Sequence, residues 1–368
     1  MKYKQFVLIA VLAVGLTACE TNTPEQGRGR YSAMFDQVWS LMEKNYVFLS
    51  MVSCDMDSLQ TDYRHKISEI SDPQSLQTTL TEMLEAIGDP NIGIVYDHTR
   101  SYKKSASADK SIGLIPYKQD AYEIMDSTYR YGDFNFGKAI RTDVNGRDTS
   151  FYDIVTFNEE INNSTSYSNS LFVNKVSVSH LQSKNKGIII DMRGCTWSDT
   201  DFANTILQCF YSKGEEYNFT AQIRSPLSLA STAFVNYPER DIHGEGLGLY
   251  SDRPVAVIVN KTVSLTAHLA ASALADLPNV AVIGRTGTGG HGGSLGFQQL
   301  GGEQYNYIVL PTVRYTGYGY ESFYEQLLPD IKVDWTPDYT QYPPAYSEDK
   351  CLSAAMDYID EHHTFNIY

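Results

Sequence analysis

The sequence has little of what several common functions require. Positive charge is scarce, with 29 Lys and Arg residues against 44 Asp and Glu residues, which gives a formal net charge of -15 at pH 7. An acidic surface repels phosphate backbones, so we expect no nucleic-acid partner. The G-x-x-x-x-G-K-[ST] motif is absent, which removes the usual signal for a phosphate-binding loop.

Cysteine is also rare. The chain has five cysteines, and none of them lies in a C-x-x-C pair. Without paired Cys and His spacing a zinc site has no support, and we predict neither a metal nor a cofactor. For Cys54, Cys195, Cys209 and Cys351 two states stay open: export permits a disulfide, and buried free thiols are the alternative.

An apolar run long enough to span a bilayer is missing too. Phe6–Leu16 is apolar but shorter than the roughly 20 residues that a spanning helix needs. Its basic start and small-residue end are typical of a secretory signal peptide over residues 1–19. The ending LTAC resembles a bacterial lipobox, which implies lipidation of Cys19; an ordinary signal peptide with a chance cysteine is the alternative. The polar segment 20–30 suits a tether. We therefore expect an exported, membrane-anchored lipoprotein, periplasmic or at the outer membrane or cell surface.

The mature chain of about 350 residues exceeds the roughly 100–200 of one domain. Residues 31–98 form a helical unit in this interpretation, because apolar side chains recur at helical spacing up to Ile87. The pattern weakens over 99–182, where short strands and loops are expected and the length is small for a complete PDZ domain. Residues 183–368 are expected to form an α/β core that ends in a helix.

The α/β prediction comes from apolar strands that alternate with helices. The expected strands are Gly187–Asp191, Pro254–Val259, Val280–Ile283, Tyr305–Leu310 and Pro311–Tyr315, and the expected helices are Phe202–Phe210, Leu265–Leu277 and Cys351–Ile359. The short connections favour a mostly parallel sheet.

A glycine-rich loop, VIGRTGTGGHGGS, follows the third of these strands and contains a literal G-x-G-x-x-G at Gly287–Gly292. A dinucleotide site needs a helix that starts inside this motif and holds the pyrophosphate. Here more glycines follow, and each weakens a helix by about 1 kcal/mol. The loop therefore serves another purpose.

The order of four further sequence blocks suggests the purpose of the glycine-rich loop. These are AIGDPNI at 86–92, GIIIDMRG at 187–194, PVAVIVN at 254–260, and PDIKV at 329–333 after the glycine loop. This order resembles the tail-specific, or C-terminal processing, serine peptidases with their tricorn-like and retinoid-binding-protein-like relatives. The resemblance implies a helical unit followed by a ββα-superhelix domain like that of Clp protease and crotonase. It also implies peptide or unfolded protein partners, or a hydrophobic small molecule.

The residues at the positions that carry chemistry in this family depart from its pattern. Aligned without gaps, the nucleophilic serine falls on Leu265, with Ser264 beside it. Ser264 is either a shifted nucleophile or the N-cap of the following helix. The lysine base of the processing peptidases falls on Gly290, and the histidine of the tricorn-like branch falls on Asn91, which has no titratable nitrogen.

Other side chains could replace them. His291, next to the lysine position, is a candidate base, and a solvent-exposed idle histidine is the alternative. Glu325 is a candidate to orient the base. The oxyanion donors fall near Gly194 and Trp197. Trp197 and Ser198 replace the two glycines of the family, and the indole is expected to crowd the approach.

Three readings follow from these departures. The first is a degenerate relative of the serine peptidases that binds peptide or another ligand in the old groove. The second is an active, divergent serine endopeptidase that cleaves unfolded or C-terminal segments through Ser264. The third is a structural or assembly lipoprotein. The sequence leaves open whether the protein is an enzyme, because nucleophile, base and oxyanion positions all differ together.

Overall fold

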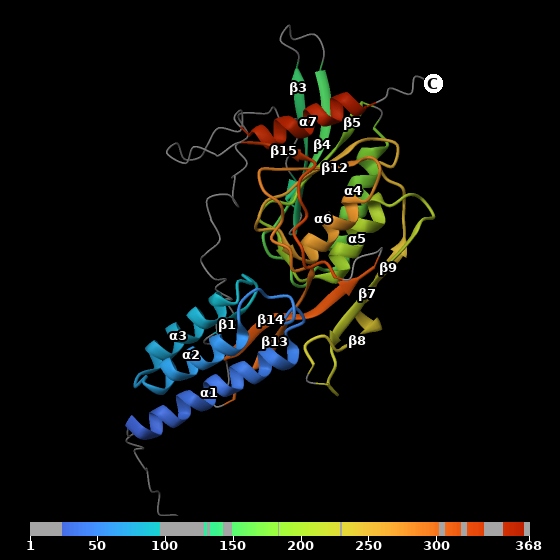
Figure 1. Cartoon of the computed structure of the whole chain (residues 1–368). Coiled ribbons are helices and arrows are strands. Elements are labelled where there is room, and N and C mark those ends of the chain that lie inside the picture. Colours follow the sequence, from blue (N-terminus) through green and yellow to red (C-terminus); the bar gives the residue numbers. More distant parts are fainter. Residues whose placement is uncertain are drawn as a thin grey trace, which may run out of the picture.

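The computed structural model describes residues 24–95, 129–130, 133–142, 149–182, 184–228, 230–301, 306–317, 322–334 and 349–363. Helices α1–α3 and one end of a sheet form one part, and a layered α/β body with helix α7 at its far side forms the other (Figure 1). The expected signal peptide with Cys19, and residues 99–128 of the region expected as strands and loops, lie outside the described residues. Within them, no helix is both long and apolar enough to cross a membrane.

Three helices make up the first part: α1 Pro24–Asn45, α2 Met56–Ser68 and α3 Pro73–Ala86. The helices expected up to Ile87 are thus confirmed. The carboxylates of Asp55 and Asp72 cap α2 and α3 by accepting the first free backbone N–H groups. The tether expected over 20–30 needs correction, because α1 is helical from Pro24. Proline is compatible with a first helical turn, and extending a helix whose later turns are packed costs little.

A seven-stranded sheet forms the centre of the α/β body and confirms the predicted fold class. Its order is β15-β12-β10-β5-β4-β3-β2, and β4, β5, β10, β12 and β15 run parallel. The strands are β2 Tyr129–Arg130, β3 Phe134–Thr142, β4 Thr149–Phe157, β5 Asn185–Asp191, β10 Val255–Ile258, β12 Val280–Gly284 and β15 Ile331–Lys332.

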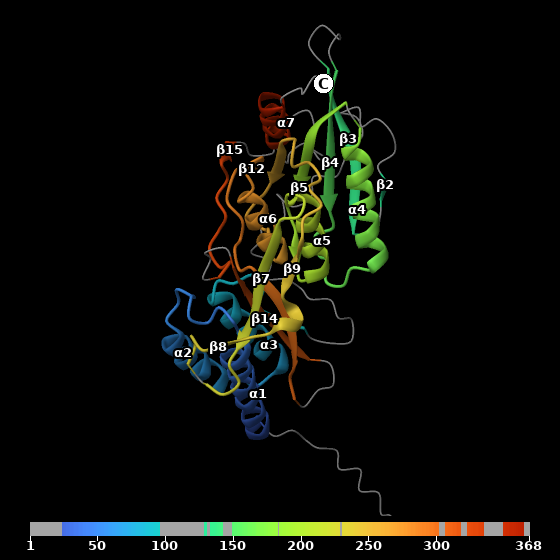
Figure 2. The same cartoon turned by 90° about the vertical axis from the view of Figure 1, so that its right-hand side faces the viewer.

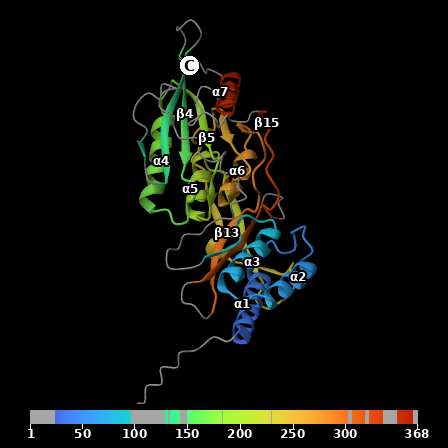
Figure 3. The same cartoon turned by 90° about the vertical axis from the view of Figure 1, so that its left-hand side faces the viewer.

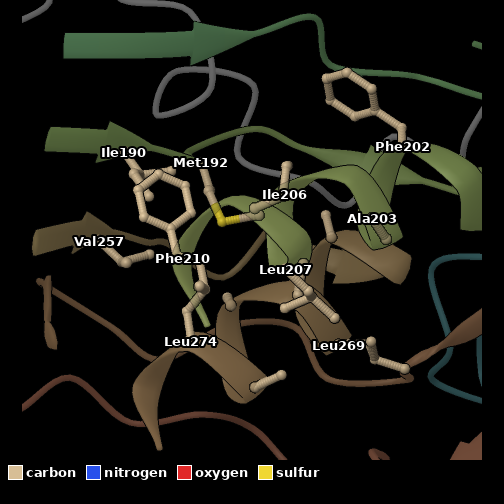
Figure 4. Packing of buried hydrophobic residues seen from close by; sticks show 14 of the residues in the cluster. Ile190, Met192, Phe202, Ala203, Ile206, Leu207, Phe210, Val257, Leu269 and Leu274 are labelled. Atoms are coloured by element: carbon tan, nitrogen blue, oxygen red, sulfur yellow. The ribbon is translucent and has the colours of Figure 1, made fainter. Parts of the chain in front are cut away.

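Helices cover both faces of this sheet (Figure 2). They are α4 Ser166–His180, α5 Thr200–Phe210 and α6 Thr266–Ala275 on one face and α7 Lys350–His362 on the other. Alternation along β5 explains the division: Ile188 and Ile190 pack with α5 and α6, whereas Ile189 packs with α7. Figure 4 shows the first of these layers, where Ile190 and Met192 meet Phe210 and Leu274.

A second sheet joins the α/β body to the helices (Figure 3). It contains β1 Gly93–Val95, β7 Glu216–Arg224, β8 Phe234–Asn236, β9 Ile242–Glu245, β13 Gly293–Gln299 and β14 Tyr307–Thr316. Ile308 and Leu310 of β14 share a core with α1–α3, whereas Val313 and Tyr315 belong to the core of the α/β body. One strand thus contributes to both cores.

The prediction of two strands divided at Pro311 was wrong, because β14 continues through this residue. On this edge β1 pairs with residues 307–309 and β7 with residues 314–316, so no strand needs the N–H that Pro311 lacks. The carbonyl of Pro311 instead accepts a hydrogen bond from the N–H of Val47 at 3.2 Å.

Two of the quoted sequence blocks, GIIIDMRG and PDIKV, make contacts that stabilise the fold. Arg193 is buried and forms ion pairs with Asp191 at 2.6 Å and with Asp349, the N-cap of α7, at 2.8 Å. Burial opposes its charge, yet the two carboxylates raise the pKa of Arg193 well above its ordinary value. In the PDI block, Asp330 accepts the N–H of Val282 at 2.8 Å. The blocks therefore anchor α7 and β12.

We predict that Arg193→Met lowers the free energy of unfolding by about 3–5 kcal/mol, because it leaves two buried carboxylates without their cation. Urea unfolding followed by circular dichroism measures the change. The matched control is Arg64→Met, which removes an ion pair to Asp36 whose two side chains are each 52% exposed and should cost at most about 1 kcal/mol. Equal losses in the two variants would contradict the assignment.

Candidate active site

The candidate site centres on a sharp turn between a short strand and helix α6. Strand β11, Ser264–Leu265, pairs in parallel with β6, Thr196–Trp197, and the Ser264 N–H donates to the Cys195 carbonyl at 3.0 Å. Leu265 then has φ 61° and ψ −136°, a conformation that a non-glycine residue rarely adopts. Its side chain is 1% exposed. A strained turn at the start of a helix is the backbone of a nucleophile elbow, and its strained residue is Leu265.

A chain of buried hydrogen bonds runs from this elbow to the helical part. The Ser264 hydroxyl lies 3.0 Å from Asn91 Oδ1. Both the backbone N–H and the side-chain amide of Asn91 donate to Asp89 Oδ1, at 2.8 and 2.9 Å. Tyr46 donates its hydroxyl to Asp89 Oδ2 at 2.9 Å. Burial, and then the Asp89 charge, raise the pKa of Tyr46 well above its usual value.

The orientation of the Asn91 amide follows from this chain. A carboxylate only accepts hydrogen bonds, so the NH2 group of Asn91 faces Asp89 and the amide oxygen faces Ser264. Ser264 must then donate its proton to an amide oxygen. An amide oxygen does not take up that proton at neutral pH, so this contact does not activate the hydroxyl.

His291 lies in the same cluster but faces a different residue. Its Nδ1 donates to the Gly289 carbonyl at 2.9 Å, which leaves Nε2 to point at Asp89 Oδ2 at 3.9 Å. The ring packs edge-on against Phe48 and Tyr324. His291 is thus largely buried rather than idle in solvent, and within the described part of the chain no hydrogen bond joins it to Ser264.

The position expected for lysine is built to exclude a side chain. Gly290 has φ +72°, and a Cβ added there would collide with the Tyr324 carbonyl oxygen. Its backbone lies beside the elbow, where Ser264 and Gly290 form an isolated parallel bridge and the Gly289 N–H donates to the Val263 carbonyl at 2.8 Å. The glycine loop therefore lines the elbow with backbone.

The expected oxyanion residues are occupied by contacts of their own. The Gly194 N–H donates to Asn260 Oδ1 at 3.2 Å. Trp197 pairs with Leu265 in the β6–β11 ladder. Its indole is fully buried, donates to the Asn158 carbonyl at 3.1 Å and packs against Phe157 and Phe202. The expectation that this indole crowds the approach was wrong, because an aromatic cluster under α5 accommodates it.

Glu325 is not joined to the cluster. Its side chain is exposed and makes no hydrogen bond or ion pair with any described residue. All four cysteines in the described residues, Cys54, Cys195, Cys209 and Cys351, are free thiols, which decides between the two states left open. No group of three or more His, Cys, Asp or Glu side chains among those residues is arranged to hold a metal.

Sequence reasoning missed His268, the fully buried histidine one turn after Ser264 on α6. Its Nδ1 lies 2.8 Å from Thr288 Oγ1, which also accepts the Leu327 N–H. The backbone of Phe323 and of Glu325 favours the protonated ring. Burial, and then the nearby His291, lower the pKa of His268 to about 3. The sequence offered only its place on an apolar helix, where a histidine is usually a buried core residue with its hydrogen bonds satisfied.

The layered sheet and the elbow at the start of α6 define a serine-peptidase-like α/β protein. Residues 154–333 match peptidase family S41, and residues 30–85 match the tricorn protease C1 domain. The predicted resemblance to this peptidase family is thus confirmed over these two regions. A match to a peptidase family implies peptide or protein substrates. A comparison with curated protein sequences finds no match.

Solved structures share the fold over nearly the whole chain. A candidate peptidase from Parabacteroides merdae is 15% identical, with a TM-score of 0.66 over 89% of this chain and 96% of its own. Mature CPAF is 10% identical, with a TM-score of 0.64 over 92% of this chain and 99% of its own. CPAF complexed with lactacystin gives 10% and 0.59 over 91% and 97%. At these identities the likeness concerns the fold alone.

We predict that stability falls as the pH is lowered from about 6.5 toward 3 and that His268→Gln reduces this loss. The unfolded chain binds a proton at this histidine below its ordinary pKa of 6.5, whereas the folded protein does not until about pH 3. Each pH unit in this window removes up to about 1.4 kcal/mol. Urea midpoints between pH 7 and 4 measure the slope, with the exposed His65→Gln as control; an unchanged slope in His268→Gln contradicts the prediction.

Proposed function

We propose that this protein is a catalytically degenerate peptidase relative that binds an extended peptide. The observation that carries the proposal is Leu265. The elbow keeps the strained backbone of a nucleophile position, with φ 61°, while its side chain has no nucleophilic atom. Such strain assists catalysis only where the strained residue presents a reactive group, and leucine presents none.

The absence of a base supports the same proposal. Asn91 stands where the tricorn-like branch has histidine, and its amide oxygen accepts the Ser264 hydroxyl. Gly290 stands where the processing peptidases have lysine, and the Tyr324 carbonyl fills the space of a side chain. His291 is directed to Asp89. Neither Asn91 nor Gly290 offers a base, and His291 would have to turn from Asp89 before it could take the Ser264 proton.

The oxyanion position adds a third argument. The Gly194 N–H is bonded to Asn260, and the N–H groups of Thr196 and Ser198 donate to the carbonyls of Glu159 and Ile161 at 2.6 and 3.0 Å. Donors that are already paired cannot stabilise a developing oxyanion without breaking those bonds. Catalysis through Ser264, the alternative function, therefore requires several rearrangements at once.

A strand edge beside the elbow supports peptide binding. Strand β13 pairs with β14 on one side only, among the described strands, and it lies next to β11. The Leu295 N–H points away from β14 and donates to Ser198 Oγ at 2.7 Å. Because successive residues of a strand alternate, the N–H and carbonyl of Phe297 point to the same outer edge. An extended peptide can add to such an edge through main-chain hydrogen bonds.

Phe297 gives this edge an apolar contact, since its side chain is 56% exposed. The proposed ligand is a peptide or unfolded segment; a hydrophobic small molecule in the same place is a second possibility. Export as a lipoprotein anchored through Cys19 is part of the proposal and rests on the lipobox-like sequence. A purely structural lipoprotein would leave this edge without a ligand.

We predict that a fluorophosphonate probe labels neither the wild type nor Ser264→Ala, and that neither cleaves unfolded casein. The double variant Leu265→Ser, Asn91→His places a hydroxyl at the elbow and an imidazole at its partner position, and it should become labelled. Labelling and cleavage by the wild type, both lost in Ser264→Ala, would establish the active alternative.

We predict that Phe297→Ala weakens binding of an extended peptide at least about tenfold, because a buried phenyl contact contributes about 1.5–3 kcal/mol. Fluorescence anisotropy with a library of labelled unstructured peptides measures the affinity. Leu227→Ala is the matched control, since Leu227 is 96% exposed on the β7–β8 turn. A library that shows no binding to the wild type would favour the structural reading.

A further inference from the structure

A buried arginine without a counter-charge lies at the end of β7, apart from the elbow. Arg224 is 6% exposed, and its Nη2 donates to the Glu43 carbonyl near the end of α1 at 3.2 Å. Its Nε and Nη1 are buried and have no acceptor among the described residues. Most of the hydrogen-bonding capacity of this guanidinium is therefore unused.

No acidic side chain of the described residues neutralises Arg224. Burial lowers the pKa of the guanidinium from its ordinary value, and no carboxylate opposes this. Glu43 is close by through its carbonyl, but its carboxylate accepts the Trp39 indole N–H at 2.8 Å. The α1 C-terminus offers only about half a negative charge. An isolated buried cation is costly unless something pairs with it.

A second arginine is positioned beside the first. Arg314 of β14 stacks over the Phe234 ring at 3.4 Å, and Arg224 lies 5.9 Å from the same ring centroid. Gln222 fixes Arg314 by accepting from its Nε and Nη2 at 3.1 and 2.9 Å, and it donates to Asn236 Oδ1 at 3.2 Å. Three adjacent strands thus hold two guanidinium groups around one phenyl ring.

A purely structural role explains only part of this arrangement. One hydrogen bond to Glu43 would fasten β7 to α1, and a neutral donor such as glutamine would serve for it without a buried charge. The cost of the charge and the unused Nε and Nη1 are explained if the site receives an anionic group. A planar carboxylate matches a guanidinium in shape, and its single charge matches the one that is uncompensated at Arg224.

We propose that Arg224, with Arg314 beside it, forms a binding site for a carboxylate group. The site is independent of the elbow and of whether Ser264 is reactive. Because Nε and Nη1 are covered by protein, the carboxylate reaches them after a local opening. The connection that follows Arg224 is exposed at Pro226, Leu227 and Ser228, so this side of the site borders solvent.

The test compares thermal unfolding midpoints in sodium acetate or sodium succinate with those in sodium chloride at equal ionic strength. A ligand that binds only the folded state raises the midpoint with its concentration. We expect the carboxylates to raise the midpoint of the full-length wild type and to leave that of Arg224→Met unchanged, with at least tenfold weaker binding by calorimetry. Arg253→Met, whose guanidinium donates to the carbonyls of Gln182 and Asn185, is the control and should respond like the wild type.

Arg224→Lys keeps the charge but loses the planar fork, so it should respond less than the wild type, and it serves if Arg224→Met does not fold. A wild type that gives the same midpoint in carboxylate and chloride would overturn the proposal. Equal responses of the wild type, Arg224→Met and Arg224→Lys would also overturn it, as would stabilisation by inorganic phosphate but not by the carboxylates.

Discussion

The buried carboxylate of Asp89 is the constraint on which the candidate site depends. It is fully buried and accepts hydrogen bonds from the Tyr46 hydroxyl and from two N–H groups of Asn91. A buried carboxylate is tolerable only when several donors surround it, so these partners cannot vary freely. Tyr46 belongs to the turn after α1, and Asn91 bonds to Ser264 of the α/β body. One charge therefore determines how the helical part sits against the elbow.

The elbow next to these hydrogen bonds combines the backbone of a nucleophile position with a leucine side chain. A leucine at φ 61° costs on the order of 1–3 kcal/mol, and the packing of its fully buried side chain has to offset that cost. A glycine would remove the strain but would also remove the side chain from the core. The backbone of the turn is thus maintained by its surroundings, namely the β6–β11 ladder on one side and the Gly290 bridge on the other.

Much of the fold followed from the sequence because its strands are apolar runs buried on both faces, such as Gly187–Asp191. The position of the elbow was also readable, since Leu265 aligned with the nucleophile without gaps. Contacts between segments that are distant in the sequence could not be predicted. The Asn91 amide meets Ser264 across 173 residues, and the Gly290 Cβ position meets a carbonyl at Tyr324. Trp197 was misjudged because its sequence position gives no information on which side its indole packs.

The sequence did not predict the positions of strand β3, strand β4 and helix α4, and the reason is related. The sequence of α4, SYSNSLFVNKVSVSH, has only a weak apolar face, and it is held by burial of Phe172 and Val176 against α5 and the sheet. Tertiary packing here outweighs local propensity.

The surroundings of the elbow also limit which base could stand beside it. A lysine cannot be accommodated at Gly290 while the Tyr324 carbonyl occupies the Cβ position. That carbonyl is itself fixed, because it accepts the His291 N–H at 3.0 Å, and the neighbouring Phe323 carbonyl accepts the Gly292 N–H at 2.6 Å. The 323–327 segment is further bonded to Thr288, whose hydroxyl forms a hydrogen bond with Nδ1 of His268 on α6. The lysine position is therefore closed by a bonded network that reaches back to the helix of the elbow, whereas the histidine position at Asn91 keeps its partners Asp89 and Ser264. Of the two bases that the family uses, lysine at position 290 and histidine at position 91, only the histidine is compatible with this backbone.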